Sequence, residues 1–338
     1  MTQSTTMLEV RDLKVHFALK KAGMFSEPAH VYAVDGVSFD VKQGSAYGIV
    51  GESGCGKSTT ALALANLIVP TSGEIILNGQ SLTARTRKEM KEIHKNLQMI
   101  FQDPYSSLDP RQRVENIIAK PMRQLTNMDE AAISRRVDEL ITKVGLRPEQ
   151  KKLFPHQFSG GQRQRIGIAR ALAVNPKLII CDEPVSALDV AIQAQVINLL
   201  KLLQKELGLT YVFISHDLAV VQRLCDALSV MYLGRVVEQG DRREIFSRPL
   251  HPYTHALLTA DPVKDPTQRG QVKRLRIEGD PPSPINPPSG CHFHTRCPYA
   301  QEICKQETPI LRDVGEGQRV ACHLVEIVNN KPVSPVSL

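Results

Sequence analysis

The stretch GESGCGKST, residues 51–59, decides the fold of this 338-residue chain. It follows the apolar segment SAYGIV (45–50) and leads into the helix-like TALALANL (60–67). A glycine-rich loop between a strand and a helix presents backbone N–H groups and a helix start to phosphate groups, which is the P-loop motif. Lys57 is placed to reach the terminal phosphates and Ser58 to hold Mg²⁺. The residues predicted to contact a nucleotide here are Gly51, Glu52, Ser53, Gly54, Cys55, Gly56, Lys57, Ser58 and Thr59.

A second apolar segment ends in two carboxylates. LIICDE (178–183) is typical of a buried strand, with Asp182 and Glu183 at its carboxyl end. Ligands of parallel α/β sheets bind at that edge. Asp182 suits the shell of Mg²⁺, and Glu183 suits a general base that orients an attacking water.

A third motif, FSGGQRQRIGIARAL (158–172), predicts a helix whose start is capped by Ser159 and Gln162. In the simplest interpretation it is only a capped helix. The glycine pair Gly160 and Gly161 at the helix start also makes it an anion-binding position. A second such position about 100 residues after the P-loop requires an explanation.

Strand and helix patterns alternate along the chain. Further strands are indicated at 210–216 and 227–234, and a helix at 189–208 lies between the strand at 178–183 and the one at 210–216. GEIILNGQSL (73–82) reads as an antiparallel hairpin edge. Residues 103–175 are helical in pattern, with Asn127 and Glu130 predicting a capping box and Gly145 a helix end. The fold class expected is α/β, with a covered parallel sheet, an antiparallel β edge and a helical insert.

Composition limits the function classes. The net charge is +7 and the pI is near 9.0, but acidic and basic residues alternate, as in TRKEMKEIHK (86–95), which favours a solvated face over a nucleic-acid patch. The longest apolar run, residues 61–69, is too short to cross a bilayer, and the start resembles no secretory signal. We expect a chain that is soluble or peripheral to another component.

The motifs together identify a family. The P-loop, Gln102, SGGQ (159–162), CDE (181–183), SALD (186–189) and His216, in that order, resemble the ATP-binding subunit of an ABC transporter over about residues 8–260. The resemblance implies ATP and Mg²⁺ as cofactors and two such domains facing head to tail. Residues that would then complete the partner's ATP site are Ser159, Gly160, Gly161, Gln162 and Asp189.

The same resemblance assigns the remaining roles. Phe17 would stack on adenine, although packing on an edge strand is the plain alternative. Gln102 would sense Mg²⁺ and the attacking water, and His216 would contact the γ-phosphate. Asp189 would lie in the dimer seam or cap the following helix, and both roles are compatible. The implied catalytic residues are Glu183, His216, Gln102 and Lys57, and the implied Mg²⁺ ligands are Ser58, Gln102 and Asp182.

The C-terminal part narrows the resemblance. RPLHPYTHALL (248–258) and GDPPSPINPPSGCHFHTRCPYAQEIC (279–304) resemble the tails of bacterial dipeptide and oligopeptide importers, and KKAGMFSEPAHVYAVDGVSF (20–39) resembles the second of their two paralogous ATPases. Implied partners are the first paralogous ATPase in a heterodimer, two transmembrane permease subunits and, indirectly, a peptide-binding protein. The implied location is the cytoplasmic face of the bacterial inner membrane.

We therefore expect an ATPase domain at 1–260, with a helical subdomain at about 103–175, and an extension at 261–338. Within it, 261–290 reads as a linker and the last ten residues as a frayed tail. Soluble ABC-type ATPases that act on nucleic acid or ribosomes are the alternative. A single P-loop and the lack of heptads disfavour them, and Glu183 and His216 disfavour a non-hydrolysing regulator.

Four of the seven cysteines gather in this extension, at Cys291, Cys297, Cys304 and Cys322. Without a secretory signal, such a group suggests a metal before disulfides. Four thiolates match a [4Fe–4S] cluster and also tetrahedral Zn²⁺, and free thiols or a disulfide pair stay open. The importer resemblance favours the cluster, and the neighbouring histidines are expected to be surface residues.

Overall fold

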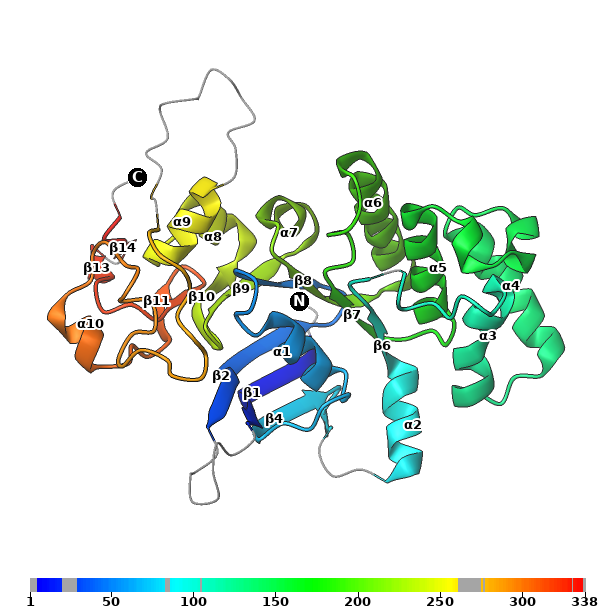
Figure 1. Cartoon of the computed structure of the whole chain (residues 1–338), viewed down its shortest axis with the longest axis horizontal. Helices are drawn as coiled ribbons and strands as arrows, with labels where there is room; N and C mark the ends of the chain where they lie inside the picture. Colours follow the sequence, from blue (N-terminus) through cyan, green and yellow to red (C-terminus); the bar gives the residue numbers. More distant parts are fainter. Residues whose placement is uncertain are drawn as a thin grey trace.

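An eight-stranded sheet forms the centre of the chain, seen here in a computed structural model (Figure 1). The structure describes residues 5–19, 29–82, 86–103, 105–260, 275, 277–329 and 331–336. In sheet order the strands are β11 (Arg312–Gly315), β12 (Gln318–Val320), β10 (Arg235–Asp241), β9 (Ala227–Tyr232), β3 (Ala46–Val50), β8 (Thr210–Ser215), β7 (Leu178–Asp182) and β6 (Leu97–Ile100).

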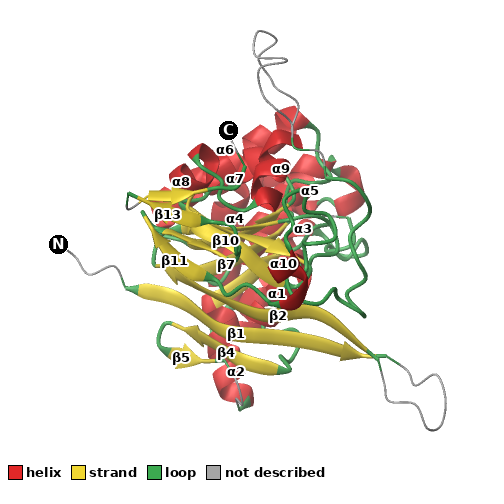
Figure 2. Cartoon of the chain, turned by 90° about the vertical axis from the view of Figure 1, so that its left-hand side faces the viewer, coloured by secondary structure: helices red, strands yellow, loops and turns green. Residues whose placement is uncertain are grey.

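A four-stranded antiparallel sheet lies below the central sheet, on the side opposite to the helices that cover it (Figure 2). Its strands, in sheet order, are β2 (His30–Lys42), β1 (Thr6–Ala18), β4 (Ser72–Leu77) and β5 (Gln80–Ser81), and a separate hairpin pairs β13 (Glu326–Val328) with β14 (Lys331–Val333). The β4–β5 hairpin confirms the antiparallel edge predicted at 73–82.

The helices connect and cover these sheets. They are α1 (Lys57–Leu64), α2 (Arg87–Asn96), α3 (Val114–Leu125), α4 (Glu130–Lys143), α5 (Gly160–Leu172), α6 (Val190–Leu207), α7 (Leu218–Leu224), α8 (Arg242–Ser247), α9 (Pro252–Ala260) and α10 (Glu302–Gln306), with 3₁₀ turns η1 (Pro148–Lys152) and η2 (Pro155–Gln157). In the described part of the chain, no helix is both long and apolar enough to span a bilayer.

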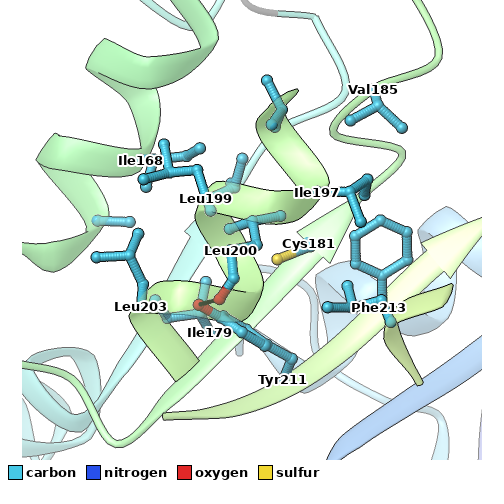
Figure 3. Packing of buried hydrophobic residues seen from close by; sticks show 14 of the residues in the cluster. Ile168, Ile179, Cys181, Val185, Ile197, Leu199, Leu200, Leu203, Tyr211 and Phe213 are labelled. Atoms are coloured by element: carbon cyan, nitrogen blue, oxygen red, sulfur yellow. Dashed lines mark hydrogen bonds between the residues drawn. The ribbon is translucent and has the colours of Figure 1, made fainter. Parts of the chain in front are cut away.

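The parallel strands β6, β7, β8, β3 and β9 are buried on both faces. Residues 179, 181, 211 and 213 of β7 and β8 pack under α6, where Leu200 and Leu203 lie above them (Figure 3). Their neighbours at 178, 180, 212 and 214 face α1 and the antiparallel sheet. A sheet covered on both faces needs continuous apolar strands, which explains LIICD and YVFI and confirms the expected α/β class.

The helical insert contains α3, α4 and α5 (Figure 1). The predicted capping box at Asn127 and Glu130 is wrong, because the N-cap of α4 is Asp129, whose carboxylate accepts from the Ala132 N–H at 2.7 Å. The Glu130 carboxylate is instead held by Arg123, at 2.8 Å from two guanidinium nitrogens. Gly145, at φ 75°, ends the segment as predicted.

The C-terminal segment is built onto the central sheet. Strand β12 pairs with β10 from Glu238–Val320 to Gly240–Gln318, so the hairpin β11–β12 extends the sheet of the nucleotide-binding part. Phe293 is 1 % exposed and belongs to the main core. The segment therefore shares a sheet and a core with the rest of the chain.

The end of the chain is more ordered than the sequence predicts. The expectation of a frayed tail is wrong for 331–336, because β14 pairs with β13, Val336 is buried, and the Ser334 hydroxyl donates to the Leu250 carbonyl at 3.0 Å. Of the predicted linker, residues 261–274 and 276 lie outside the described residues, as do residues 20–28 of the importer-like N-terminal stretch. Residues 277–290 contain neither helix nor strand.

Candidate nucleotide-hydrolysis site

The P-loop runs between the end of β3 and the start of α1, as its motif predicts. A Cβ at Gly51 would lie 2.3 Å from the Met231 carbonyl oxygen, and one at Gly56 would lie 2.1 Å from the Ala33 carbonyl oxygen. Both glycines have positive φ. Only glycine fits these two positions. The loop therefore packs directly against the backbone at Met231 and Ala33.

Lys57 lies inside this loop. Its side chain is 4 % exposed, and Nζ donates to the carbonyl oxygens of Gly51 and Glu52 at 2.8 Å each. A buried ammonium inside a glycine-rich loop is suited to hold an anion there.

The next residue of α1 faces the second motif. The Ser58 hydroxyl donates to the Asp182 carboxylate at 3.1 Å, which joins α1 to the end of β7. Burial raises the pKa of Asp182, and the Ser58 hydrogen bond opposes that rise. A buried carboxylate beside a hydroxyl is a set of hard oxygen ligands, so these residues fit Mg²⁺.

Glu183 is the centre of a hydrogen-bonded group. Its Oε2 accepts from Gln102 Nε2 at 2.9 Å and lies 3.2 Å from His216 Nδ1. The three side chains come from the segments that follow β6, β7 and β8, three neighbouring parallel strands. Because the carboxyl ends of such strands meet at one edge, residues far apart in sequence are brought together.

The backbone at Glu183 is strained. Its φ is 43°, a conformation that non-glycine residues adopt at a cost, and its N–H donates to the Ile214 carbonyl at 3.0 Å. The Glu183 residue is 8 % exposed, whereas the His216 side chain is 50 % exposed. A nearly buried carboxylate with an open neighbour can orient one water at the mouth of the site.

The SGGQ motif forms the predicted capping box. Ser159 Oγ accepts from the Gln162 N–H at 3.3 Å, and Gln162 Oε1 accepts from the Ser159 N–H at 3.0 Å. A Cβ at Gly161 would lie 2.3 Å from Ile192 Cγ2, so this glycine lets α5 approach α6. Asp189 caps α6 by accepting from the Ile192 N–H at 3.0 Å. Gly160 is partly exposed, and α5 lies among the helices of the insert, away from α1 (Figure 1).

Phe17 lies near the end of β1, opposite Val31 of β2, with 43 % of the residue exposed. Its side chain is therefore open to solvent beside the paired strands β1 and β2. Of the remaining P-loop residues, Ser53, Gly54 and Cys55 lie between β3 and α1, and Thr59 lies in the first turn of α1.

Two residues at this site were missed by the sequence analysis. Tyr253 of α9 accepts from the Glu52 N–H through its hydroxyl at 2.8 Å, and Arg296 donates to the Glu52 carboxylate at 2.8 and 3.3 Å. Tyr253 belongs to the importer-like stretch 248–258. That stretch indicated the family, but nothing in it indicated a contact with the P-loop. Arg296 carried no signal beyond its place next to Cys297.

The four cysteines lie near one another. The Cys291 N–H donates to the Cys304 carbonyl at 2.8 Å. Burial is the main cause that raises the pKa of Cys297, to about 11, and of Cys322, to about 12, and the neighbouring thiols add to both. Within the ranges described above, no three His, Cys, Asp or Glu side chains are arranged to hold a metal ion.

The nearby histidines have other partners. One ring nitrogen of each lies 2.9–3.2 Å from a backbone carbonyl oxygen: that of Leu233 for His292, Cys291 for His294 and Glu307 for His323. The expectation of surface histidines is wrong for His292, which is buried and has its Nδ1 3.2 Å from the carbonyl oxygen of Leu233, the residue after β9.

Comparison with known proteins gives two family matches. A profile described as "ABC transporter" matches residues 34–186, and one described as "Oligopeptide/dipeptide transporter, C-terminal region" matches residues 237–304. The second match includes the stretches 248–258 and 279–304 that carry the importer resemblance.

Curated relatives align along almost the whole chain. The oligopeptide transport ATP-binding protein AppF of Bacillus subtilis is 51 % identical over 94 % of this chain and 97 % of its own length. OppF of Salmonella typhimurium is 51 % identical over 91 % and 93 %. The di/tripeptide transport ATP-binding protein DppF of Pseudomonas aeruginosa is 46 % identical over 95 % and 98 %.

Solved structures agree on the fold. The chain matches cbiO1 from Clostridium perfringens with a TM-score of 0.62 at 30 % identity, over 72 % of this chain and 92 % of the other. It matches the ATP-binding cassette MJ0796, described as a dimeric post-hydrolysis state bound to ADP and Pi, with a TM-score of 0.62 at 28 % identity, over 70 % and 99 %. These findings do not favour the alternative of an ATPase that acts on nucleic acid or ribosomes.

Proposed function

The chain belongs to the family of oligopeptide and dipeptide transport ATP-binding proteins of the ABC transporters, and we propose that it hydrolyses ATP to drive import of dipeptides or oligopeptides through a membrane complex. It is an ABC-type ATPase. The observation that carries the proposal is the contact of Gln102 and His216 with the Glu183 carboxylate, at the sheet edge that also bears Lys57 and Asp182.

The residues divide the work of phosphoryl transfer. Lys57 holds the terminal phosphates, and Ser58, Asp182 and Gln102 would hold Mg²⁺, which neutralises the charge of the phosphate oxygens. Glu183 orients the attacking water, while His216 contacts the γ-phosphate from the open side. Catalysis then depends on positioning and on charge stabilisation more than on covalent chemistry.

The contacts to ATP come from two chains in this proposal. Residues 51–59 and the Phe17 ring bind the phosphates and the adenine in one chain. The helix start at Ser159–Gln162, with Asp189, completes the site of a facing partner. Two observations support this: the helix start is capped and partly exposed but lies away from α1, and the matched MJ0796 cassette is described as a dimer.

The remaining partners follow from the family. We propose a heterodimer with a paralogous ATPase, bound to two transmembrane permease subunits on the cytoplasmic face of the bacterial inner membrane, and served indirectly by a peptide-binding protein. The ATPase domain would span 1–260, with its helical subdomain at about 103–175. Residues 261–338 would form an extension that docks on its sheet.

We propose that the extension holds a [4Fe–4S] cluster through Cys291, Cys297, Cys304 and Cys322, with Zn²⁺ as the alternative. Burial, with a smaller effect from the neighbouring thiols, raises the pKa of Cys291, Cys297 and Cys322, and a bound cation would stabilise such donors as thiolates. A single Zn²⁺ needs its ligands about 2.3 Å from one centre, whereas a cluster separates its four ligands more widely. The four cysteines within residues 291–322 supply the four thiolates that either kind of site requires.

The import proposal is tested by uptake of a labelled dipeptide in cells that lack this chain and carry it, or a variant, on a plasmid. Lys57→Ala is expected to lower uptake by about 100-fold, because the buried ammonium at the phosphates is lost. Lys201→Ala, at an exposed position of α6, serves as the matched control. Uptake by the Lys57 variant at the control's rate would refute the role of this site.

The metal proposal is tested separately by iron, sulfide and zinc analysis of the protein purified without oxygen. Four iron and four sulfide per chain, lost in Cys297→Ser, are expected. One zinc per chain and no iron would show that the four cysteines bind Zn²⁺ and not a cluster. Neither result alters the test of the ATPase site.

A further inference from the structure

Glu52, the second residue of the P-loop, is held at three points. Its carbonyl accepts from Lys57 Nζ at 2.8 Å, its N–H donates to the Tyr253 hydroxyl at 2.8 Å, and its carboxylate accepts from Arg296 at 2.8 and 3.3 Å. The first contact lies within the P-loop. The other two come from residues 201 and 244 positions away, beyond the ATPase motifs.

Arg296 is held in place by hydrogen bonds from all three of its guanidinium nitrogens. Its side chain is 8 % exposed, and both terminal guanidinium nitrogens face the Glu52 carboxylate. The third nitrogen, Nε, donates to the Gly279 carbonyl at 3.1 Å. The planar fork of arginine is therefore used in full, a geometry that lysine does not reproduce.

The loop that carries Arg296 reaches Glu52 by a second route. Phe293 packs against Tyr232 and Tyr253, with ring centroids 5.1 and 5.4 Å apart. Tyr253 is the residue whose hydroxyl accepts the Glu52 N–H. The loop between Cys291 and Cys297 therefore contacts Glu52 directly through Arg296 and indirectly through Phe293 and Tyr253.

We propose that Arg296 and Tyr253 are positioning residues of the nucleotide site, through which the cysteine-bounded loop 291–297 fixes the P-loop in a shape ready for ATP. The proposal rests on the ATPase function proposed above. A loop already held in its bound shape loses less conformational freedom on binding. Pairing with Arg296 also neutralises a carboxylate that would otherwise repel the incoming phosphates.

The same contacts make the coupling reciprocal. A change in the loop 291–297 that moves Arg296 changes the affinity for ATP, and bound ATP stabilises that loop by the same factor. The four-cysteine segment is then part of the nucleotide site and not only an appendage that stabilises the chain.

The experiment titrates a fluorescent ATP analogue into the full-length chain and measures KM and kcat for ATP in the assembled transport complex. Arg296→Ala is expected to weaken binding and raise KM by about fivefold or more, with kcat at saturating ATP little changed. Tyr253→Phe, which removes only the hydroxyl, is expected to raise KM by about two- to fivefold. The matched controls are Arg319→Ala and Tyr299→Phe, in the same segment but away from Glu52.

Wild-type affinity in both variants would overturn the proposal, and so would equal weakening in the variants and their controls. If Arg296→Ala does not fold, Tyr253→Phe and Arg296→Lys are measured in its place. A KM for ATP that is unchanged in both of these variants would overturn the proposal. Lys57→Ala is included as a reference. If the wild-type chain itself binds no ATP, the proposed function fails, an outcome distinct from failure of this inference.

Discussion

The nucleotide site and the four-cysteine segment are both made of loops, yet they are held in opposite ways. The loops of the nucleotide site follow the ends of parallel strands buried on both faces, so the sheet places Ser58, Asp182 and Glu183 at one edge. The cysteine segment contains little regular structure and is held by what it docks on, through the β10–β12 pairing and Phe293. The first site is therefore fixed by the order of strands in the sheet, and the second by contacts between residues far apart in the sequence.

The largest effect is expected at Phe293, whose packing holds the cysteine segment on the rest of the chain. It is 1 % exposed among Tyr232 and Tyr253, so Phe293→Ala is expected to lower the free energy of unfolding by about 4 kcal/mol. The control is Ile310→Ala, at a position 81 % exposed, with an expected change within about 0.5 kcal/mol. Urea unfolding compares the two, and equal small effects would show that the segment is not part of the core.

The free energy of unfolding is predicted to depend on pH through Glu238, which lies where β10 pairs with the C-terminal segment. Burial raises the pKa of Glu238 to about 7, so the folded chain keeps a proton there that the unfolded chain releases above about 4.5. The contribution of this group to stability is therefore full below pH 4.5 and is lost as the pH rises through 7. Its carboxylate accepts from the N–H groups of Leu250 and His251, next to β12.

The measurement is the difference in free energy of unfolding between wild type and Glu238→Gln from pH 4.5 to 8. The difference is used because burial lowers the pKa of His251 to about 3, an opposing effect that acts below pH 6.5. Wild-type stability relative to the variant is expected to fall on the order of 3 kcal/mol as the pH rises. A flat difference would contradict the account, and Glu326→Gln on the surface is the control.

A smaller effect is expected in the helical insert. Asp129→Ala removes the cap of α4 and is expected to lower the free energy of unfolding by about 1 kcal/mol. Asn127→Ala, two residues earlier, is expected to change it by a few tenths at most. Thermal unfolding of the two variants distinguishes the observed cap from the one that the sequence predicts. A larger loss of stability in Asn127→Ala than in Asp129→Ala would favour the sequence prediction.

The prediction from sequence succeeded where local pattern and topology agree. The strand–loop–helix setting of residues 51–59 and the strand ending in Glu183 are local patterns, and parallel strands must end at one edge. The class of fold follows from these patterns and from the family resemblance. The contacts of Gln102 and His216 with Glu183 are seen only in the structure, because the resemblance assigned these two side chains to Mg²⁺, water and the γ-phosphate.

The sequence failed where a contact depends on packing across the chain. Arg296 and Glu52 are 244 residues apart, and no motif marks either as a partner of the other. Asn127 and Asp129 are both good caps, and only the start of α4 decides between them. The order at 331–336 comes from the β13–β14 hairpin and from the hydrogen bond that the Ser334 hydroxyl donates to the Leu250 carbonyl, which composition does not reveal.

We propose that Glu183 at the sheet edge drives ATP hydrolysis in this chain. The direct measurement is the ATP turnover of the assembled transport complex with Glu183→Gln, alongside ATP binding by the same variant. We predict a loss of turnover of at least about 100-fold with ATP binding retained, because only the orientation of the attacking water is lost. Turnover near that of the wild type would contradict the account.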